Sequence, residues 1–135
     1  MNSEIYILSI KLEKNATIDI GKLGKFTFPQ GYYVYTGSAR KNLSSRIERH
    51  KRKNNKKLRW HIDYLLNCKY AHIENVFTFE NSKLDECSMN KKIIKLNGSE
   101  IIVKGFGSSD CRNGCPAHLI FFNNKNSFTF FFKRK

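Results

Sequence analysis

Residues 31–50 read GYYVYTGSARKNLSSRIERH and change their hydrophobic period halfway. Their first half is aromatic and β-branched, which predicts a β-strand that ends at Gly37. From Asn42, which we expect to cap a helix, the period becomes helical. Arg46 and His50 share one stripe of this helix with its apolar residues, so both are expected to face the core. A core-facing arginine is unusual in a helix whose only role is to pack against a hydrophobic core.

The flanking sequence extends this pattern into a single domain over residues 1–135. Apolar alternation and turn residues predict further strands at residues 4–12, 70–79, 117–122 and 127–132, and further helices at residues 58–66 and 85–96. Residues 13–30 form an inserted loop or a short hairpin, and residues 123–126 are expected to join the last two strands as a C-terminal β-hairpin. The expected fold class is therefore α/β, in the α+β sense.

The composition fits one packed domain. A chain of 135 residues with 40% hydrophobic residues can bury one core. No run approaches the roughly 18 apolar residues of a membrane span, and the N-terminus MNSEIYILSI lacks the basic region and cleavage site of a secretory signal. We therefore expect a soluble, cytoplasmic protein with no membrane partner. Its four cysteines are expected to be reduced thiols.

Positive charge is concentrated in one segment. Residues 40–59 contain ten Lys or Arg and one acid, Glu48, so they supply +9 of the formal charge of +14. A localised positive field attracts polyanions, which favours nucleic acid as the partner over a merely solvated face or an anionic membrane surface. The residues expected to contact nucleic acid are Arg40, Lys41, Arg49, Lys51, Arg52, Lys53, Lys56 and Lys57. Of these, Arg49, Lys51 and Arg52 are expected to point away from the core.

Several motifs together resemble a known nuclease superfamily. Residues 35–39 (YTGSA), with Arg46 and His50 after them, resemble the second half of the GIY-YIG signature, and residues 4–6 (EIY) resemble the first half. Residues 60–65 (WHIDYL), 86–87 (EC), 105–111 (GFGSSDC) and 118–119 (HL) resemble a small uncharacterised branch of that superfamily, found alone or fused to endonuclease III-like proteins. The resemblance runs from Ile5 to Phe122, with residues 105–135 as an extension specific to this branch.

The resemblance implies a small central antiparallel sheet flanked by helices and a phosphodiesterase that uses one divalent ion, Mg²⁺ or Mn²⁺. Tyr6 would accept a proton from the attacking water or position it, and Tyr35 would support that site. Arg46 would stabilise charge on the phosphate oxygens, as preorganised cations do. His50 would assist proton transfer or orient a tyrosine. Glu86 would bind the metal, since a hard oxygen ligand suits these ions.

Three features depart from the superfamily pattern. Glu4 stands where the first half-motif has glycine, and Thr36 stands where the second has isoleucine. Tyr6 and Tyr35 are 29 positions apart, which makes residues 13–30 an insertion. Glu4 also brings a negative charge near a phosphate site. These departures leave open whether catalysis is retained.

Each candidate residue also has a purely structural interpretation. Strand tyrosines such as Tyr6 and Tyr35 commonly pack, half-buried, in a core. Arg46 could pair with Asp63 or extend past the core. His50 could be a polar residue at a helix end. These alternatives explain the residues singly, whereas the nuclease hypothesis explains their common placement.

A second group of residues could form a metal site or line the same cleft. Cys111, Cys115 and His118 are close enough in sequence to supply three zinc ligands, with Cys68, Cys87 or His72 as a fourth. This spacing is not one of the stronger zinc patterns, so zinc is the less favoured cofactor. The additional site residues suggested by the branch motifs are Gly37, His61, Asp63, Ser108, Ser109, Asp110 and His118.

Three functional hypotheses follow. The first is a DNA endonuclease specific for branched, flapped or damaged DNA, acting in repair or recombination, because no sequence-reading module is present. The second is a nucleic-acid-binding module with weak or no catalysis that acts with a repair protein. The third is an RNA-binding or RNA-processing role. The residues do not decide the oligomeric state.

Overall fold

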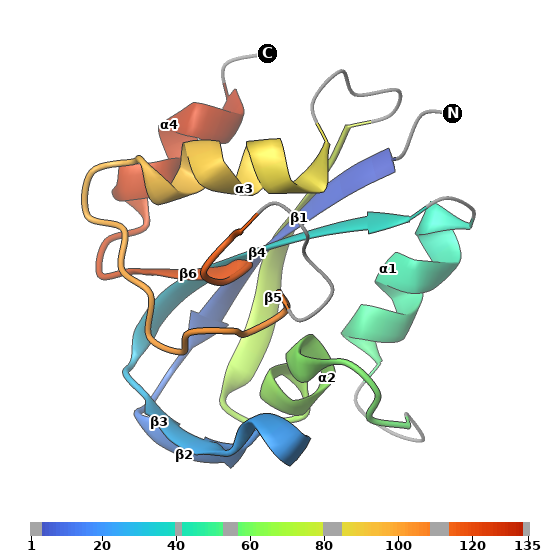
Figure 1. Ribbon diagram of the computed structural model, residues 1–135, viewed down its shortest axis with the longest axis vertical. Helices are drawn as coiled ribbons and strands as arrows, with labels where there is room; N and C mark the ends of the chain where they lie inside the picture. Colours follow the sequence, from blue (N-terminus) through green and yellow to red (C-terminus); the bar gives the residue numbers. More distant parts are fainter. Residues whose placement is uncertain (1–3, 40–41, 53–56, 80–84, 109–113, 134–135) are drawn as a thin grey trace.

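The computed structural model describes residues 4–39, 42–52, 57–79, 85–108 and 114–133. They form an α+β fold around a four-stranded antiparallel sheet of order β5-β1-β4-β6 (Figure 1). The strands of this sheet are β1 (Glu4–Leu12), β4 (Gly31–Ala39), β5 (Ala71–Phe79) and β6 (Leu119–Phe122). The helices are α1 (Leu43–Lys51), α2 (His61–Leu66), α3 (Glu86–Ile94) and α4 (Asn126–Lys133). The expected central antiparallel sheet flanked by helices is confirmed.

The insertion between β1 and β4 is a separate two-stranded hairpin. It consists of β2 (Ala16–Asp19) and β3 (Lys25–Phe28), joined by the 3₁₀ helix η1 (Gly21–Leu23). Of the inserted loop or short hairpin expected over residues 13–30, the structure shows the hairpin. None of the helices in the described parts of the chain is long and apolar enough to cross a membrane.

The sheet is buried on both faces. Tyr6, Leu8 and Ile10 of β1 join one core cluster with the apolar residues of α1 and α2. Ile5 and Ile7 of the same strand join a second cluster with residues of α3 and α4. Helices α3 and α4 therefore cover one face and α1 and α2 the other, as Figure 1 shows. This burial explains why β1 is apolar almost throughout instead of alternating with polar residues.

Two sequence predictions about secondary structure are wrong. Strand β4 does not end at Gly37 but continues to Ala39, because residues 37–39 still pair with β1. The expected C-terminal β-hairpin is absent, since residues 126–133 form helix α4. Phe128 and Phe132 fit both the period of a strand and the i, i+4 spacing of a helix. Both are buried on the sheet in the helical arrangement.

The pairing of β1 with β4 places Tyr6 directly opposite Gly37. A Cβ atom at position 37 would lie 2.5 Å from both Cζ and the hydroxyl oxygen of Tyr6. Gly37 does not adopt a positive φ, so its backbone would accept alanine without strain. Space alone therefore requires glycine here, because the Tyr6 ring lies close to the β4 backbone at this position.

We predict that Gly37→Ala lowers the free energy of unfolding by about 1–3 kcal/mol, the usual cost of overpacking. Urea denaturation measures this cost. In the double variant with Tyr6→Leu, which removes the ring that the methyl group strikes, the two costs are expected to be clearly less than additive. Additive costs would contradict the proposed contact between this glycine and the tyrosine.

An ion pair joins α1 to α2. Arg49 donates from Nη1 to Oδ1 of Asp63 at 2.7 Å and from Nη2 to Oδ2 at 3.0 Å, and the Asp63 side chain is fully buried. Oδ2 also accepts the backbone N–H groups of Arg59 (2.8 Å) and Trp60 (2.9 Å). Burial alone would raise the pKa of Asp63, but these hydrogen bonds and the Arg49 charge outweigh it and lower the pKa. The expectation that Arg49 points away from the core is therefore wrong. Asp63 forms its ion pair with Arg49 and not with Arg46, the partner considered from the sequence.

We predict that Asp63→Ala lowers the free energy of unfolding by about 3–5 kcal/mol, because it leaves Arg49 and two backbone N–H groups without their acceptor. Glu74→Ala, which removes the exposed partner of Lys125, is the matched control and is expected to cost at most about 1 kcal/mol. Urea denaturation of both variants tests the difference.

The Asp63 contribution also has a defined pH dependence. Because its pKa is lowered on folding, the stabilisation is complete above the ordinary value of 3.8 and is lost as pH falls through the folded-state pKa. The stability difference between wild type and Asp63→Asn is therefore expected to shrink in acid below that value. A difference that stays constant down to the acid transition would contradict the lowered pKa.

Candidate active site

Tyr6, Tyr35 and His50 meet on the face of the sheet that α1 covers. The Tyr6 hydroxyl lies 2.8 Å from Nε2 of His50, and the two ring centroids are 5.5 Å apart. The Tyr35 ring centroid is 6.4 Å from each of the other two. Tyr6 is 1% and His50 2% exposed. The core-facing position predicted for His50 is therefore confirmed.

Burial determines the direction in which the pKa values of these two tyrosines are shifted. It raises the pKa of Tyr6 well above the usual range, with Arg46 opposing the shift and Glu86 and Asp63 adding to it. The pKa of Tyr35 is also raised, again chiefly by burial. Both phenols therefore keep their protons at neutral pH, and Tyr6 can donate its proton to Nε2 of a neutral His50. Tyr6 acts as a base only if it passes this proton on.

Arg46 lies on α1 one turn before His50 and is half-buried. Its Nη1 donates to the backbone carbonyl of Ser38 at 2.9 Å. Its guanidinium also lies 4.7 Å from the ring centroid of Trp60. The positive charge of Arg46 lowers the pKa of Tyr6, so Arg46 acts electrostatically on the buried pair of Tyr6 and His50.

Glu86 reaches the same end of β4 from the opposite face of the sheet. It lies in the first turn of α3, and its Oε1 accepts the Ser38 hydroxyl at 2.6 Å. Strand β6 pairs with β4 only as far as Tyr35, so Ser38 lies beyond the last β6 partner. Ser38 thus contacts Arg46 through its carbonyl and Glu86 through its hydroxyl. The negative charge of Glu86 also acts on both tyrosines.

The surroundings of Glu86 fit a magnesium or manganese ion. Each carboxylate oxygen accepts one hydrogen bond, from Ser38 on Oε1 and from Nδ1 of His118 on Oε2 at 2.7 Å. A carboxylate oxygen has two acceptor sites, so each retains one for a cation. The side chain is 28% exposed. A single, partly exposed carboxylate suits an ion that keeps most of its waters.

Among the additional predicted residues, His61, Asp63 and Ser108 have structural partners. Nδ1 of His61 accepts the backbone N–H of Gly107 at 2.8 Å, and the imidazole packs against Phe106 at 5.6 Å between centroids. Asp63 holds Arg49. Ser108 is half-buried, and its backbone N–H donates to Gly105 at 3.3 Å. These residues position loops and helices around the candidate site.

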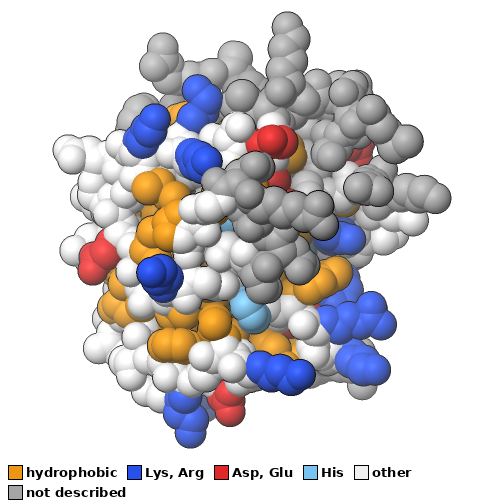
Figure 2. All heavy atoms as spheres, viewed as in Figure 1, with side chains coloured by type: hydrophobic (Ala, Val, Ile, Leu, Met, Phe, Trp, Pro, Cys, Tyr) orange, Lys and Arg blue, Asp and Glu red, His pale blue; other side chains and the backbone are white. Residues whose placement is uncertain are grey.

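The basic segment is described only in part. Lys51, Arg52 and Lys57 are exposed, whereas Arg49 is engaged with Asp63. Figure 2 shows Lys and Arg side chains gathered on the side of the molecule where α1 and the chain entering α2 lie. The predicted residues that fall outside the described part of the chain are Arg40, Lys41, Lys53, Lys56, Ser109, Asp110 and Cys111.

Three residues of the site were not among the expected catalytic or binding residues. Ser38 links Arg46 to Glu86, yet a small polar residue at a strand end carries no sequence signal of that role. Trp60 is 38% exposed, and the guanidinium groups of Arg46 and Arg49 each lie 4.7 Å from its ring centroid. Cys87 lies next to His118 and was named only as one of several fourth zinc ligands.

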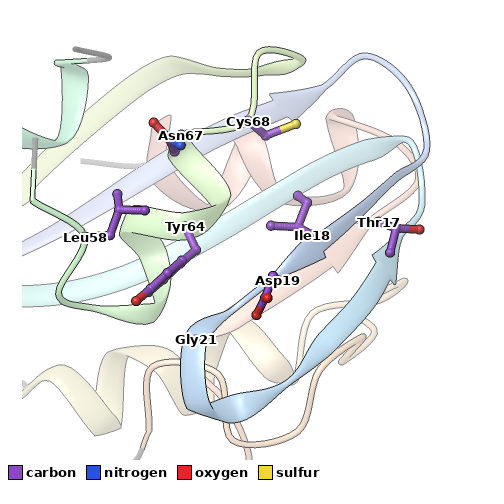
Figure 3. A pocket seen from close by; sticks show the side chains of 8 residues that line it. All are labelled: Thr17, Ile18, Asp19, Gly21, Leu58, Tyr64, Asn67 and Cys68. Carbon is purple, nitrogen blue, oxygen red and sulfur yellow. The ribbon is translucent and has the colours of Figure 1, made fainter. Parts of the chain in front are cut away.

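A separate pocket lies away from these residues. It has a volume of about 480 Å³ and lies between the β2–β3 hairpin and the end of α2 (Figure 3). Ile18 and Asp19 line it on one side and Tyr64 and Cys68 on the other. Tyr6, Tyr35, Arg46 and Glu86 do not contribute to its lining. The predicted site is therefore not this pocket but the side-chain cluster at the end of β4.

Comparison with known proteins adds the family. No curated protein and no solved structure matches the chain. Residues 5–134 match the model of a family described as a domain of unknown function, DUF123. This match spans nearly the whole sequence, and the chain belongs to the DUF123 family.

Proposed function

We propose that this chain is a metal-dependent endonuclease of the GIY-YIG type that hydrolyses DNA phosphodiester bonds. The observation that carries the proposal is the convergence at the end of β4. The hydrogen-bonded pair Tyr6 and His50 lies on one face, Glu86 arrives from the other, and Arg46 is tied to the same residue, Ser38, as Glu86. Packing alone does not require a general base, a cation and a free carboxylate site at one strand end.

The proton transfer in this proposal uses two residues. The attacking water gives a proton to the Tyr6 oxygen as Tyr6 passes its own proton to Nε2 of His50, so the phenol never has to ionise fully. This relay suits a tyrosine whose pKa is raised by burial. The water oxygen then forms the new bond to phosphorus, and the bond from phosphorus to the leaving oxygen breaks.

Arg46 would stabilise the negative charge that develops on the phosphate oxygens. Its guanidinium is preorganised by the Ser38 carbonyl and by the Trp60 ring, so it needs no reorganisation during the reaction. A divalent ion held by Glu86 would supply Lewis acidity at the phosphate. Ser38 and His118 orient the Glu86 carboxylate for that role.

The exposed surface beside Arg46 suits nucleic acid. Trp60 presents an aromatic ring on which a base could stack, and Lys51 and Arg52 extend the positive charge past the end of α1. These contacts involve backbone charge and stacking, which carry little sequence information. The preference we propose is therefore for DNA structure, as in branched, flapped or damaged DNA.

One observation favours a second candidate, a nucleic-acid-binding module that acts with a repair enzyme. Tyr6 is only 1% exposed, so water reaches its hydroxyl only when the side chains over it move. A module without catalysis would keep the basic surface and use the tyrosine as a core residue. The same module could bind RNA instead of DNA.

We predict metal-dependent cleavage of a labelled panel of single-stranded, duplex, flapped, forked and four-way DNA in Mg²⁺ or Mn²⁺. Arg46→Ala is expected to reduce the single-turnover rate by about 10²- to 10³-fold, as loss of one preorganised donor does, and Glu86→Gln is expected to abolish metal-dependent cleavage. The matched controls are Lys22→Ala and Glu13→Gln, which make the same charge changes at exposed positions elsewhere.

The outcomes separate the candidates. Cleavage lost in both site variants and kept in both controls supports the nuclease. Binding of the panel without cleavage in any metal supports the binding module, and the inclusion of RNA in the panel decides between DNA and RNA. Cleavage that survives both site substitutions would contradict the proposed site.

The basic surface gives a second prediction. Replacing Lys51, Arg52 and Lys57 with alanine is expected to weaken binding to every panel member and to reduce the salt slope by about 2 to 3, near 0.9 per lost phosphate contact. The charge-matched control replaces Lys22, Lys25 and Lys69. Fluorescence anisotropy at several salt concentrations measures both slopes. Equal effects of the two triple variants would contradict a localised nucleic-acid surface.

A further inference from the structure

A group of three metal-ligating side chains lies beside Glu86, and its two cysteines have no part in the proposed nuclease chemistry. Cys87 of α3, Cys115 and His118 each offer one ligand atom, and these atoms lie within 4.8 Å of one another. Cys115 is 7% and His118 1% exposed, and Cys87 is half-buried. From this cluster we propose a zinc site formed by the two thiolates and the Nε2 atom of His118.

The orientation of His118 supports this assignment. Its Nδ1 lies 2.7 Å from Oε2 of Glu86 and 3.4 Å from the backbone carbonyl of Thr36. Both neighbours are acceptors, so Nδ1 carries the proton, and Nε2 is left with a lone pair toward the thiols. A carboxylate that accepts from the outer nitrogen of a histidine is the usual support of a zinc-binding imidazole.

The separation of Cys87 and His118 is close to that of two ligands of one zinc ion. Zinc bonds of 2.0 to 2.3 Å place tetrahedral ligand atoms roughly 3.3–3.8 Å apart. The distance from Cys87 Sγ to His118 Nε2 is 3.9 Å. Two thiols and an imidazole select zinc over magnesium, because thiolates are soft ligands. Three protein ligands leave the fourth position to water or to a further ligand.

The hydrogen bonds within the cluster are long. Cys115 Sγ donates to the Cys87 carbonyl at 3.8 Å, and the contact between Cys87 and His118 is as long. Thiols are poor donors, so these contacts add little stability. Binding of zinc would join the first turn of α3 to the start of β6 and would hold Glu86 in place through His118.

This set differs from the one expected from the sequence. The three predicted ligands were Cys111, Cys115 and His118, and Cys111 lies outside the described residues. Cys87 is 28 positions from Cys115 and reaches it only because α3 packs beside β6. Cys68 and His72 are not in the cluster: Cys68 lines the pocket of Figure 3, and His72 pairs with Glu13 at 3.3 Å.

The zinc content of the full chain, purified without chelator, tests the proposal independently of any nuclease assay. Wild type and the control Cys68→Ser are expected to contain about one zinc per chain, and Cys87→Ser and Cys115→Ser at least about tenfold less, as expected when one of three protein ligands is lost. Elemental analysis gives the stoichiometry. Glu86→Gln is expected to bind zinc about 10- to 100-fold more weakly in competition with a chromophoric chelator.

If the cysteine variants fail to fold, cobalt binding to the wild-type protein tests the site instead. Wild type loaded with Co²⁺ in place of zinc is expected to show thiolate-to-cobalt absorption together with the visible bands of tetrahedral cobalt. Absence of both zinc and this absorption in wild type would overturn the proposal. So would a Cys87–Cys115 disulfide found by mass spectrometry in freshly purified protein, or full zinc retention in both cysteine variants.

Discussion

The close approach of Tyr6 to Gly37 is the constraint on which the site depends. It follows from the unbroken pairing of β1 with β4, and it leaves room for the tyrosine ring only because position 37 has no side chain. The Tyr6 ring lies on the side of the sheet that α1 covers, and its hydroxyl is 2.8 Å from Nε2 of His50. A shift of one residue in this register would move Tyr6 to the other face of the sheet and separate it from His50.

The two faces of the sheet contribute different chemistry to one strand end. Helix α1 brings a cation and an imidazole, and α3 brings a carboxylate, while Ser38 contacts both helices. The Arg49–Asp63 pair fixes α1 against the chain entering α2, and the same chain presents Trp60 beside the basic surface. The zinc cluster that we propose would fix α3 in a similar way. In this account, the structural contacts around the site set the geometry of the few groups that would act on a phosphate.

Local sequence patterns predicted most of this arrangement and failed where tertiary contacts decide. The bounds of β1 and the buried position of His50 were predicted correctly, because long apolar alternation and helical spacing are strong signals. The C-terminal hairpin was wrong because Phe128 and Phe132 satisfy both periods, and their packing on the sheet selects the helix. Helical spacing also misplaced Arg49, since its partner Asp63 lies 14 positions away. Ser38 gains its importance only from the contacts of α1 and α3 with it, and Cys87 only because α3 brings it close to Cys115 and His118.

In the proposed nuclease, Arg46 and Glu86 belong to one catalytic site. A double-mutant cycle in single-turnover cleavage tests it most directly, with Arg46→Ala, Glu86→Gln and the double variant assayed on the same labelled substrate. Groups that act together on one transition state lose far less in combination than the product of their single losses. A shared catalytic site therefore predicts strong non-additivity. Losses that multiply independently, or a wild type that cuts no nucleic acid in any metal, would contradict it.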